Sequence, residues 1–106
     1  MPKYLFIATY SPEGVRGVLD EGGTGRRSAV EQLATSLGGS LESFYFAFGA
    51  DDAFVVCDLP DNEAAAAVGL TVSAAGKAGL RTVALLTCEQ VDAAAKLSPT
   101  YRPPGG

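Results

Sequence analysis

Short apolar runs alternate with glycine-rich and polar segments along this chain, and the runs predict β-strands. One strand is expected at Lys3–Tyr10, two more in a hairpin within Ser40–Asp61, and a last one at Leu80–Thr87. Between the hairpin strands, Gly49-Ala50-Asp51-Asp52 should form a tight turn, because glycine tolerates positive φ and aspartate hydrogen-bonds its own backbone. The pattern therefore predicts four strands, two of them paired locally.

The predicted strands are apolar on both faces. In the first strand Tyr4, Phe6 and Tyr10 face one way, and Leu5 and Ile7 face the other. In the first hairpin strand, one face is expected to carry Phe44, Phe46 and Phe48 and the other Leu41, Tyr45 and Ala47. In the second hairpin strand, one face is expected to carry Val55, Cys57 and Leu59 and the other Phe54, Val56 and Asp58. A sheet with one face in water would alternate apolar and polar residues, so both faces of this sheet need a cover.

Helical patterns separate the first strand from the hairpin. Ser11-Pro12-Glu13 predicts a helix start, with serine as the N-cap and proline at the first helical position. Glu21-Gly22-Gly23 should interrupt this helix, because consecutive glycines have a high entropic cost in a helix interior. A longer helix is expected to start at Ser28, which has capping-box spacing, or one turn earlier at Thr24. Gly38-Gly39 should end it.

Further helices are predicted after the hairpin. Asp61 is expected to cap an alanine-rich helix that reaches Ala75. A short closing helix is expected at Glu89–Leu97, beginning at Thr87 or Cys88. We therefore expect a single domain over residues 1–97, followed by an extended, Pro/Gly-rich tail over residues 98–106.

The predicted element order is βαββαβ, which is the α+β order of a ferredoxin-like fold with a four-stranded antiparallel sheet and helices on one face. The simplest cover for the other face is a second copy of the sheet, in a dimeric α+β barrel type of assembly or a larger ring. The strand order 4-1-3-2 would separate Cys57 from Cys88, which we place in strand-like runs, by two strand spacings. That separation is too large for a disulfide, so both thiols should be free.

Composition narrows the set of partners. The chain has a net charge of −4 and no basic stripe, which argues against nucleic acid. It has neither an apolar run long enough for a membrane span nor a signal-peptide pattern, so we expect a cytoplasmic protein with no membrane partner. Histidine is absent, which removes the commonest general base and the commonest transition-metal ligand. We expect no metal and no cofactor.

From Tyr4 to about Val91 the chain resembles the GYD family. The similar segments are YSPEGVRGVL, EGGTGRR, AVEQLATSLGG, LESFYFAFG and DLPDNEAAAAVGLTVSAAG. The family is named after a Gly-Tyr-Asp run between the hairpin strands, and the matching positions here are Gly49, Asp51 and Asp52, without the tyrosine. The resemblance implies a ferredoxin-like, dimeric α+β barrel type of fold. It implies no established activity, and any role of the missing phenol does not carry over.

One candidate ligand site lies where the second helix begins. Gly23, Thr24, Arg26 and Arg27 combine flexible backbone, a hydroxyl and two guanidinium groups at a helix start, where free N–H groups attract anions. The alternative is that the glycines only allow a kink and the arginines pair with nearby acids. The segment matches neither the P-loop nor the dinucleotide-binding pattern.

A second candidate site is the inner face of the sheet, where five polar residues are expected to converge on a largely apolar pocket: Tyr4, Tyr10, Tyr45, Asp58 and Thr82. An acid in such a pocket has a raised pKa and can act as a general base. Asp58, Tyr45 and Tyr10 are therefore the catalytic candidates. Against this reading, Asp58 is close to the end of its strand, and tyrosines at interfaces usually serve packing.

Two other chemistries are disfavoured. Adjacent Asp51 and Asp52 lack the further oxygen ligands that a calcium or magnesium site needs, so we assign them to turn formation. Cys57 has no histidine to lower its pKa and is assigned to the core.

Three functions remain after these exclusions. The absence of a strong catalytic constellation favours a non-enzymatic homo-oligomeric module that binds a small molecule at the sheet or the subunit interface. The first alternative is a cofactor-independent enzyme, of monooxygenase or isomerase type, on a hydrophobic or aromatic substrate. The second is an anion- or nucleotide-sensing regulator that uses Arg26 and Arg27.

Overall fold

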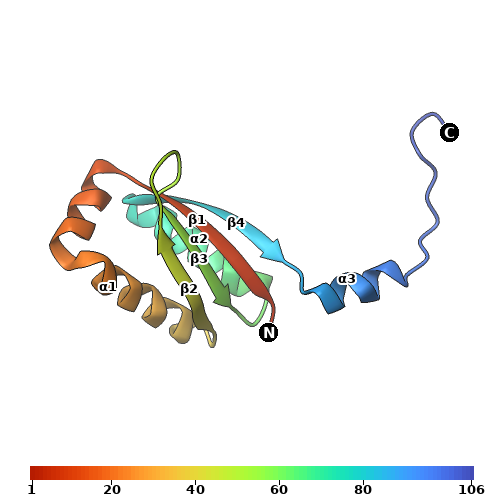
Figure 1. Cartoon of the computed structure of the whole chain (residues 1–106), viewed down its shortest axis with the longest axis horizontal. Coiled ribbons are helices and arrows are strands. Elements are labelled where there is room, and N and C mark those ends of the chain that lie inside the picture. Colours follow the sequence, from red (N-terminus) through yellow and green to blue (C-terminus); the bar gives the residue numbers. More distant parts are fainter.

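A four-stranded antiparallel sheet forms the centre of the computed structural model, which describes residues 1–106 (Figure 1). The strands are β1 (Lys3–Tyr10), β2 (Ser40–Phe46), β3 (Ala53–Asp58) and β4 (Ala78–Leu85). Their order, β2-β3-β1-β4, is the predicted order 4-1-3-2 from the opposite edge. With helices between β1 and β2 and between β3 and β4, the α+β ferredoxin-like fold is confirmed.

Two helices, α1 (Pro12–Ser36) and α2 (Asn62–Ala75), cover one face of the sheet, which we call the helix face (Figure 1). The predicted caps are confirmed. The Ser11 side chain accepts a hydrogen bond from the backbone N–H of Gly14, and the Asp61 carboxylate accepts one from Ala64. These oxygens satisfy N–H groups that have no partner within the helix.

Helix α1 is kinked at Gly22, where φ is 80° and ψ is 165°. The predicted interruption is therefore confirmed, but the predicted new start at Ser28 or Thr24 is wrong. Helical backbone resumes directly after Gly22 and continues to Ser36, so Ser28 and Thr24 lie within the helix. The physical reason is that one glycine at positive φ, which residues with a side chain rarely adopt, turns the chain within a single residue.

The hairpin differs from its prediction in two places. Strand β2 ends at Phe46, so residues 47–52 form a longer loop and Phe48 is exposed at its tip rather than in the strand. A β-bulge lies between Leu41 and Ser43. The extra residue reverses the alternation. Leu41 therefore pairs with Cys57 on the helix face and packs against the core, instead of pointing the same way as Tyr45.

The last strand and the cysteine after it are shifted relative to the prediction. Strand β4 covers Ala78–Leu85 rather than Leu80–Thr87, because Gly76 ends α2 in a left-handed conformation and extended pairing with β1 starts at Ala78. Cys88 is the first residue of α3 and is exposed, not part of a strand. Both cysteines are free, as predicted.

The hydrophobic core lies between the two helices and the helix face. Its buried members are Tyr4, Phe6, Ala34, Val55, Cys57, Leu59, Ala64, Ala65 and Val68. Leu59 is fully buried. The Tyr4 hydroxyl donates a 2.6 Å hydrogen bond to Asn62 Oδ1, which ties β1 to the start of α2. The core therefore joins the sheet to both helices.

The third helix, α3 (Cys88–Ala95), extends beyond the end of the sheet (Figure 1). Thr87 and Gln90 form a capping box at its start, confirming the predicted start, yet none of its residues is buried. We call residues 86–106 the arm, because the chain continues from α3 as an extended segment away from the sheet (Figure 1). No helix of the protein combines the length and the apolar character that a bilayer crossing requires.

Candidate functional site

A cavity of about 120 Å³ lies between the helix face and the two helices, and we call it the helix-face cavity. Fourteen of its fifteen lining residues are hydrophobic, and Arg26 is the exception. For comparison, an apolar cavity of roughly 150 Å³ engineered into another protein stays free of water and binds benzene. The helix-face cavity therefore has the size and chemistry for a group of about one ring.

The strand and helix periods explain why the cavity forms here. Alternation along β1 points Phe6, Ala8 and Tyr10 toward the helices. Helix α1 contributes Ala29 and Ala34 from the opposite side. The side chains of Ala8, Ala29 and Ala34 are too short to fill the space between the layers. The cavity is thus a consequence of small residues on facing elements.

Two lining side chains carry a nitrogen or oxygen atom: the otherwise hydrophobic Tyr10 and the charged Arg26. The Tyr10 backbone N–H donates a 2.8 Å hydrogen bond to Asp52 Oδ2, which fixes the end of β1 against the hairpin loop. Burial raises the pKa of the Tyr10 phenol; among nearby charges, Arg26 lowers this pKa, whereas Asp52 and Glu21 raise it. The phenol therefore stays protonated at neutral pH and can donate a hydrogen bond.

Arg26 has a donor without an acceptor. Its Nε atom is buried and makes no hydrogen bond. The nearest acid is Glu21, whose Oε1 lies 3.4 Å from Nε, an ion-pair distance. An arginine N–H that is buried without an acceptor costs free energy, so a group that supplied an acceptor at this place would bind more tightly.

The residues of the predicted anion site do not face a common point. Arg26 lines the helix-face cavity, whereas Arg27 lines a groove along β2 together with Glu31. Gly23 and Thr24 are exposed on α1. The arrangement does not gather the two guanidinium groups around one ligand.

The predicted convergence of Tyr4, Tyr10, Tyr45, Asp58 and Thr82 is wrong. The register places Tyr4, Tyr10 and Thr82 on the helix face and the other two residues on the opposite face. Alternation shows which residues of one strand share a face, but it does not show which of the two faces packs against the helices. The sequence pattern therefore does not separate the two groups. Tyr10 alone of the three catalytic candidates lines the helix-face cavity.

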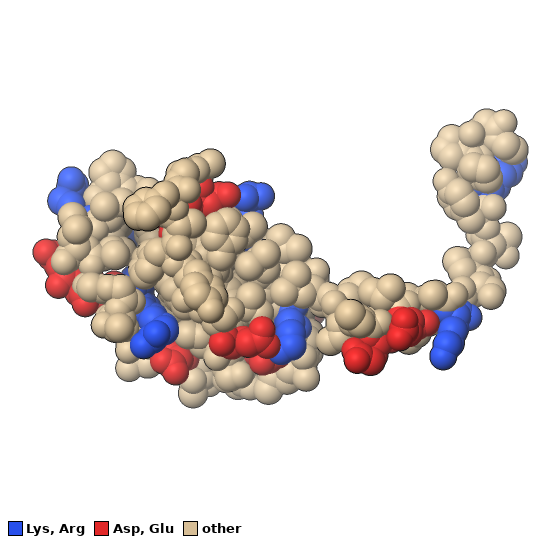
Figure 2. Space-filling model, in the orientation of Figure 1, with Lys and Arg blue, Asp and Glu red and all other residues tan.

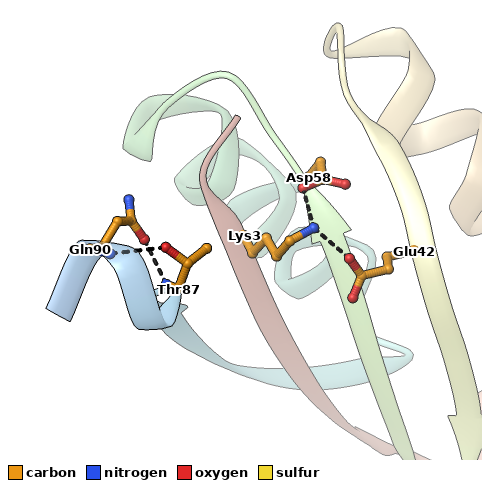
Figure 3. Close-up of polar contacts among 5 residues, drawn as sticks. All are labelled: Lys3, Glu42, Asp58, Thr87 and Gln90. Carbon is orange, nitrogen blue, oxygen red and sulfur yellow. Dashed lines mark hydrogen bonds and ion pairs between the residues drawn. The ribbon is translucent and has the colours of Figure 1, made fainter. Parts of the chain in front are cut away.

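Asp58 lies in an ion-pair cluster on the opposite face. Lys3 Nζ donates to Asp58 Oδ1 at 2.8 Å and also pairs with Glu42, as Figure 3 shows. These acids make the side-chain hydrogen bonds that raise the pKa of Lys3. Asp58 is therefore bound to a cation rather than set in an apolar pocket as a base.

The face of the sheet without helices, which we call the open face, is apolar at its centre. Its central side chains are Leu5, Ile7, Tyr45, Phe54, Val56 and Val83. Tyr45 is 71%, Val83 40% and Phe54 37% exposed. In the view of Figures 1 and 2, where α2 lies behind the strands, the surface over the strands is mostly uncharged, with charged groups near its edges.

The hairpin loop, residues 47–52, is held in place by contacts with β1 and β4. Gly49 has φ of 132°, a conformation that side-chain-bearing residues rarely adopt, which supports its predicted role in the turn. Asp51 Oδ2 pairs with Arg81 Nη2 of β4 at 3.1 Å. The Asp52 backbone N–H donates to the carbonyl of Ala8. Both aspartates therefore hold the loop in place, and no group of three potential metal-ligating side chains occurs in the structure.

Cys57 is a core residue, as predicted. Its side chain lies on the helix face, and burial raises the pKa of its thiol to about 11, with a smaller contribution from Asp58. A thiol with such a pKa is almost fully protonated at neutral pH and is a poor nucleophile.

Sequence reasoning found two polar residues of the cavity, Tyr10 and Arg26, but assigned them to different sites. It missed the alanines Ala8, Ala29 and Ala34, which give the cavity its space. Their spacing carries no signal, because alanine is equally common in tightly packed helix contacts.

Comparison with known proteins gives one match. A family model described as GYD domain matches residues 4–95. No curated protein and no solved structure matches the chain.

Proposed function

The chain belongs to the GYD family, a family of uncharacterised function, and we propose its function from its own geometry: a homo-oligomeric module that binds a small apolar molecule. In this proposal the molecule occupies the helix-face cavity, and two copies of the chain meet through the open face. The protein works in the cytoplasm, a location that agrees with its two free cysteines.

The observation that carries the binding proposal is the volume of the cavity. Its volume of about 120 Å³ is large enough for one ring, and its lining is almost entirely apolar. A ligand that covers this apolar surface gains roughly 25 cal/mol per Å² removed from water.

The assembly proposal rests on the open face. No helix covers its apolar centre, where Tyr45, Phe54 and Val83 are exposed although Ile7 is buried, and burial contributes roughly 25 cal/mol per Å² of apolar surface. A two-fold axis that crosses the strands would place the apolar centres of two copies against each other.

The arm gives a second reason to propose assembly. An isolated helix of 8 residues is only marginally stable in water, and α3 has no buried residue. Three of the exposed large hydrophobic residues in or beside it are Leu86, Val91 and Leu97. These side chains gain a cover if the arm packs against a neighbouring copy.

The two alternative functions have less support. A cofactor-independent enzyme needs an acid or base in the cavity, and no carboxylate lines it. A nucleotide sensor needs clustered basic groups, and Arg26 and Arg27 line different hollows.

The binding proposal is tested by a titration of the protein with benzene, in which NMR monitors the chemical shifts of the backbone amides. We expect saturable shifts at residues that line the cavity, such as Val30 and Val68. Val72→Phe, which fills the cavity, should weaken binding by at least about tenfold. Val15→Phe is the matched control, because Val15 is 43% exposed on α1 and does not line the cavity. The absence of saturable shifts in the unmodified protein would reject the proposal.

A further inference from the structure

The chemistry of Arg26 restricts which small molecules suit the helix-face cavity. Arg26 is the one lining residue with a charged side chain, and its buried Nε–H has no acceptor. A pure hydrocarbon would fill the space and leave this donor unpaired. A ligand with a hydrogen-bond acceptor would satisfy it, and hydrogen bonds to charged groups are worth more than those between neutral groups.

The charges around Arg26 decide between an anionic and an uncharged acceptor. Glu21 Oε1 lies 3.4 Å from Arg26 Nε. The Asp52 carboxylate lies at the end of β1, where it accepts the Tyr10 backbone N–H. This region therefore holds two carboxylates and one guanidinium group, so its net charge is negative. A carboxylate on the ligand would be repelled by both acids, whereas a carbonyl oxygen would not.

The second polar lining residue points to the same acceptor. The Tyr10 phenol remains protonated at neutral pH, because burial raises its pKa. It is therefore a neutral hydrogen-bond donor that lines the same cavity as Arg26, whose charge lowers the pKa of the phenol. Two donors in one cavity fit an oxygen with two lone pairs, which is what a carbonyl group offers.

We propose that the ligand of the helix-face cavity is a compact, uncharged, apolar molecule with one carbonyl-type oxygen, and that Arg26 accounts for its preference over a hydrocarbon of the same shape. This inference rests on the proposed binding function. Cyclohexanone, methylenecyclohexane and cyclopentanecarboxylate are suitable probes. The first two have nearly the same shape and differ in whether they carry an oxygen, and the third carries a charge.

The experiment measures the affinity of each probe for the full chain by NMR titration, with the unmodified protein and with Arg26→Met. Methionine keeps an unbranched apolar stem and removes the guanidinium group. We expect Arg26→Met to weaken cyclohexanone by about tenfold or more, which is the size of one lost hydrogen bond to a charged group. Methylenecyclohexane should bind Arg26→Met as well as it binds the unmodified protein.

The unmodified protein provides a test that does not depend on the variant. It should bind cyclohexanone at least as tightly as methylenecyclohexane, although the hydrocarbon leaves water more easily. It should bind cyclopentanecarboxylate about tenfold more weakly than cyclohexanone, because of the nearby acids.

The outcomes separate this inference from the binding function itself. If benzene and all three probes fail to bind, the cavity is not a binding site and both proposals fail. If methylenecyclohexane binds at least tenfold more tightly than cyclohexanone, or if Arg26→Met weakens both equally, the acceptor preference is wrong while the binding function stands. If the carboxylate binds most tightly, the inference of an uncharged ligand is overturned.

Discussion

The two faces of the sheet are built from the same strands but differ in their charges and their cover. The strand residues on the helix face include no charged side chain, and α1 and α2 bury the centre of that face. The open face has an apolar centre as well, but Lys3, Asp58 and Arg81 lie on it near the edges, and no helix covers it, so that Tyr45 and Val83 remain exposed. The comparison teaches that one face is adapted to an interior, and the other to an interface whose edges remain in contact with water.

The largest expected effect is on the helix face. Leu59→Ala should lower the free energy of unfolding by about 3 kcal/mol, because Leu59 is fully buried and the neighbouring residues collapse only partly into the space. Urea denaturation of the unmodified protein and of Leu59→Ala measures this loss of free energy. The loss should be the same at every protein concentration. A loss below about 1 kcal/mol would mean that this face is not the core of the protein.

The next effect concerns the open face. Phe54→Glu should weaken association of two copies by about a hundredfold or more, because a carboxylate would be buried without a partner in the interface. The far-UV circular dichroism spectrum should stay the same. Leu19→Glu is the matched control, since Leu19 is 78% exposed on α1 and lies outside the sheet. If both variants associate like the unmodified protein, the open face is not the interface.

A smaller effect is expected from pH on the helix face. The pKa of Cys57 is raised from 9.0 to about 11 in the folded protein. Below pH 9 both states hold the proton, so the thiol contributes no pH dependence. Between about pH 9 and pH 11 the unfolded chain loses its proton first, and the free energy of unfolding falls by an amount on the order of 2 kcal/mol.

Comparison with Cys57→Ala isolates this contribution. The raised pKa of Lys3 also removes stability, but at higher pH, as the ammonium group loses its proton. Urea denaturation of both proteins from pH 8 to pH 11 should therefore show a steeper decline for the unmodified chain. Parallel curves would contradict a buried, protonated Cys57.

The sequence predicted those parts of the fold that depend on local periods. The alternation in β1, the caps at Ser11 and Asp61, and the break at Gly22 follow from residues close together in the chain. The bulge next to Leu41 did not, because an extra residue in a strand leaves no mark on composition.

The candidate site was less predictable than the fold. The sequence pattern places Tyr45 and Asp58 on the same face as Tyr10, whereas the register places them on the opposite face. Which residues of two neighbouring strands share a face depends on how the strands pair, and neither strand alone determines it. The cavity is lined by Ala8 of β1 and by Ala29 and Ala34 of α1. Which residues of a strand and a helix line one cavity is a property of tertiary packing, which no local pattern encodes.

Sedimentation equilibrium of the full chain at micromolar concentration tests the central claim that the open face is covered by a second copy. The account predicts a mass of at least twice the 10.8 kDa of one chain, returning to a single chain in Phe54→Glu. A stable mass of one chain for the unmodified protein would contradict it.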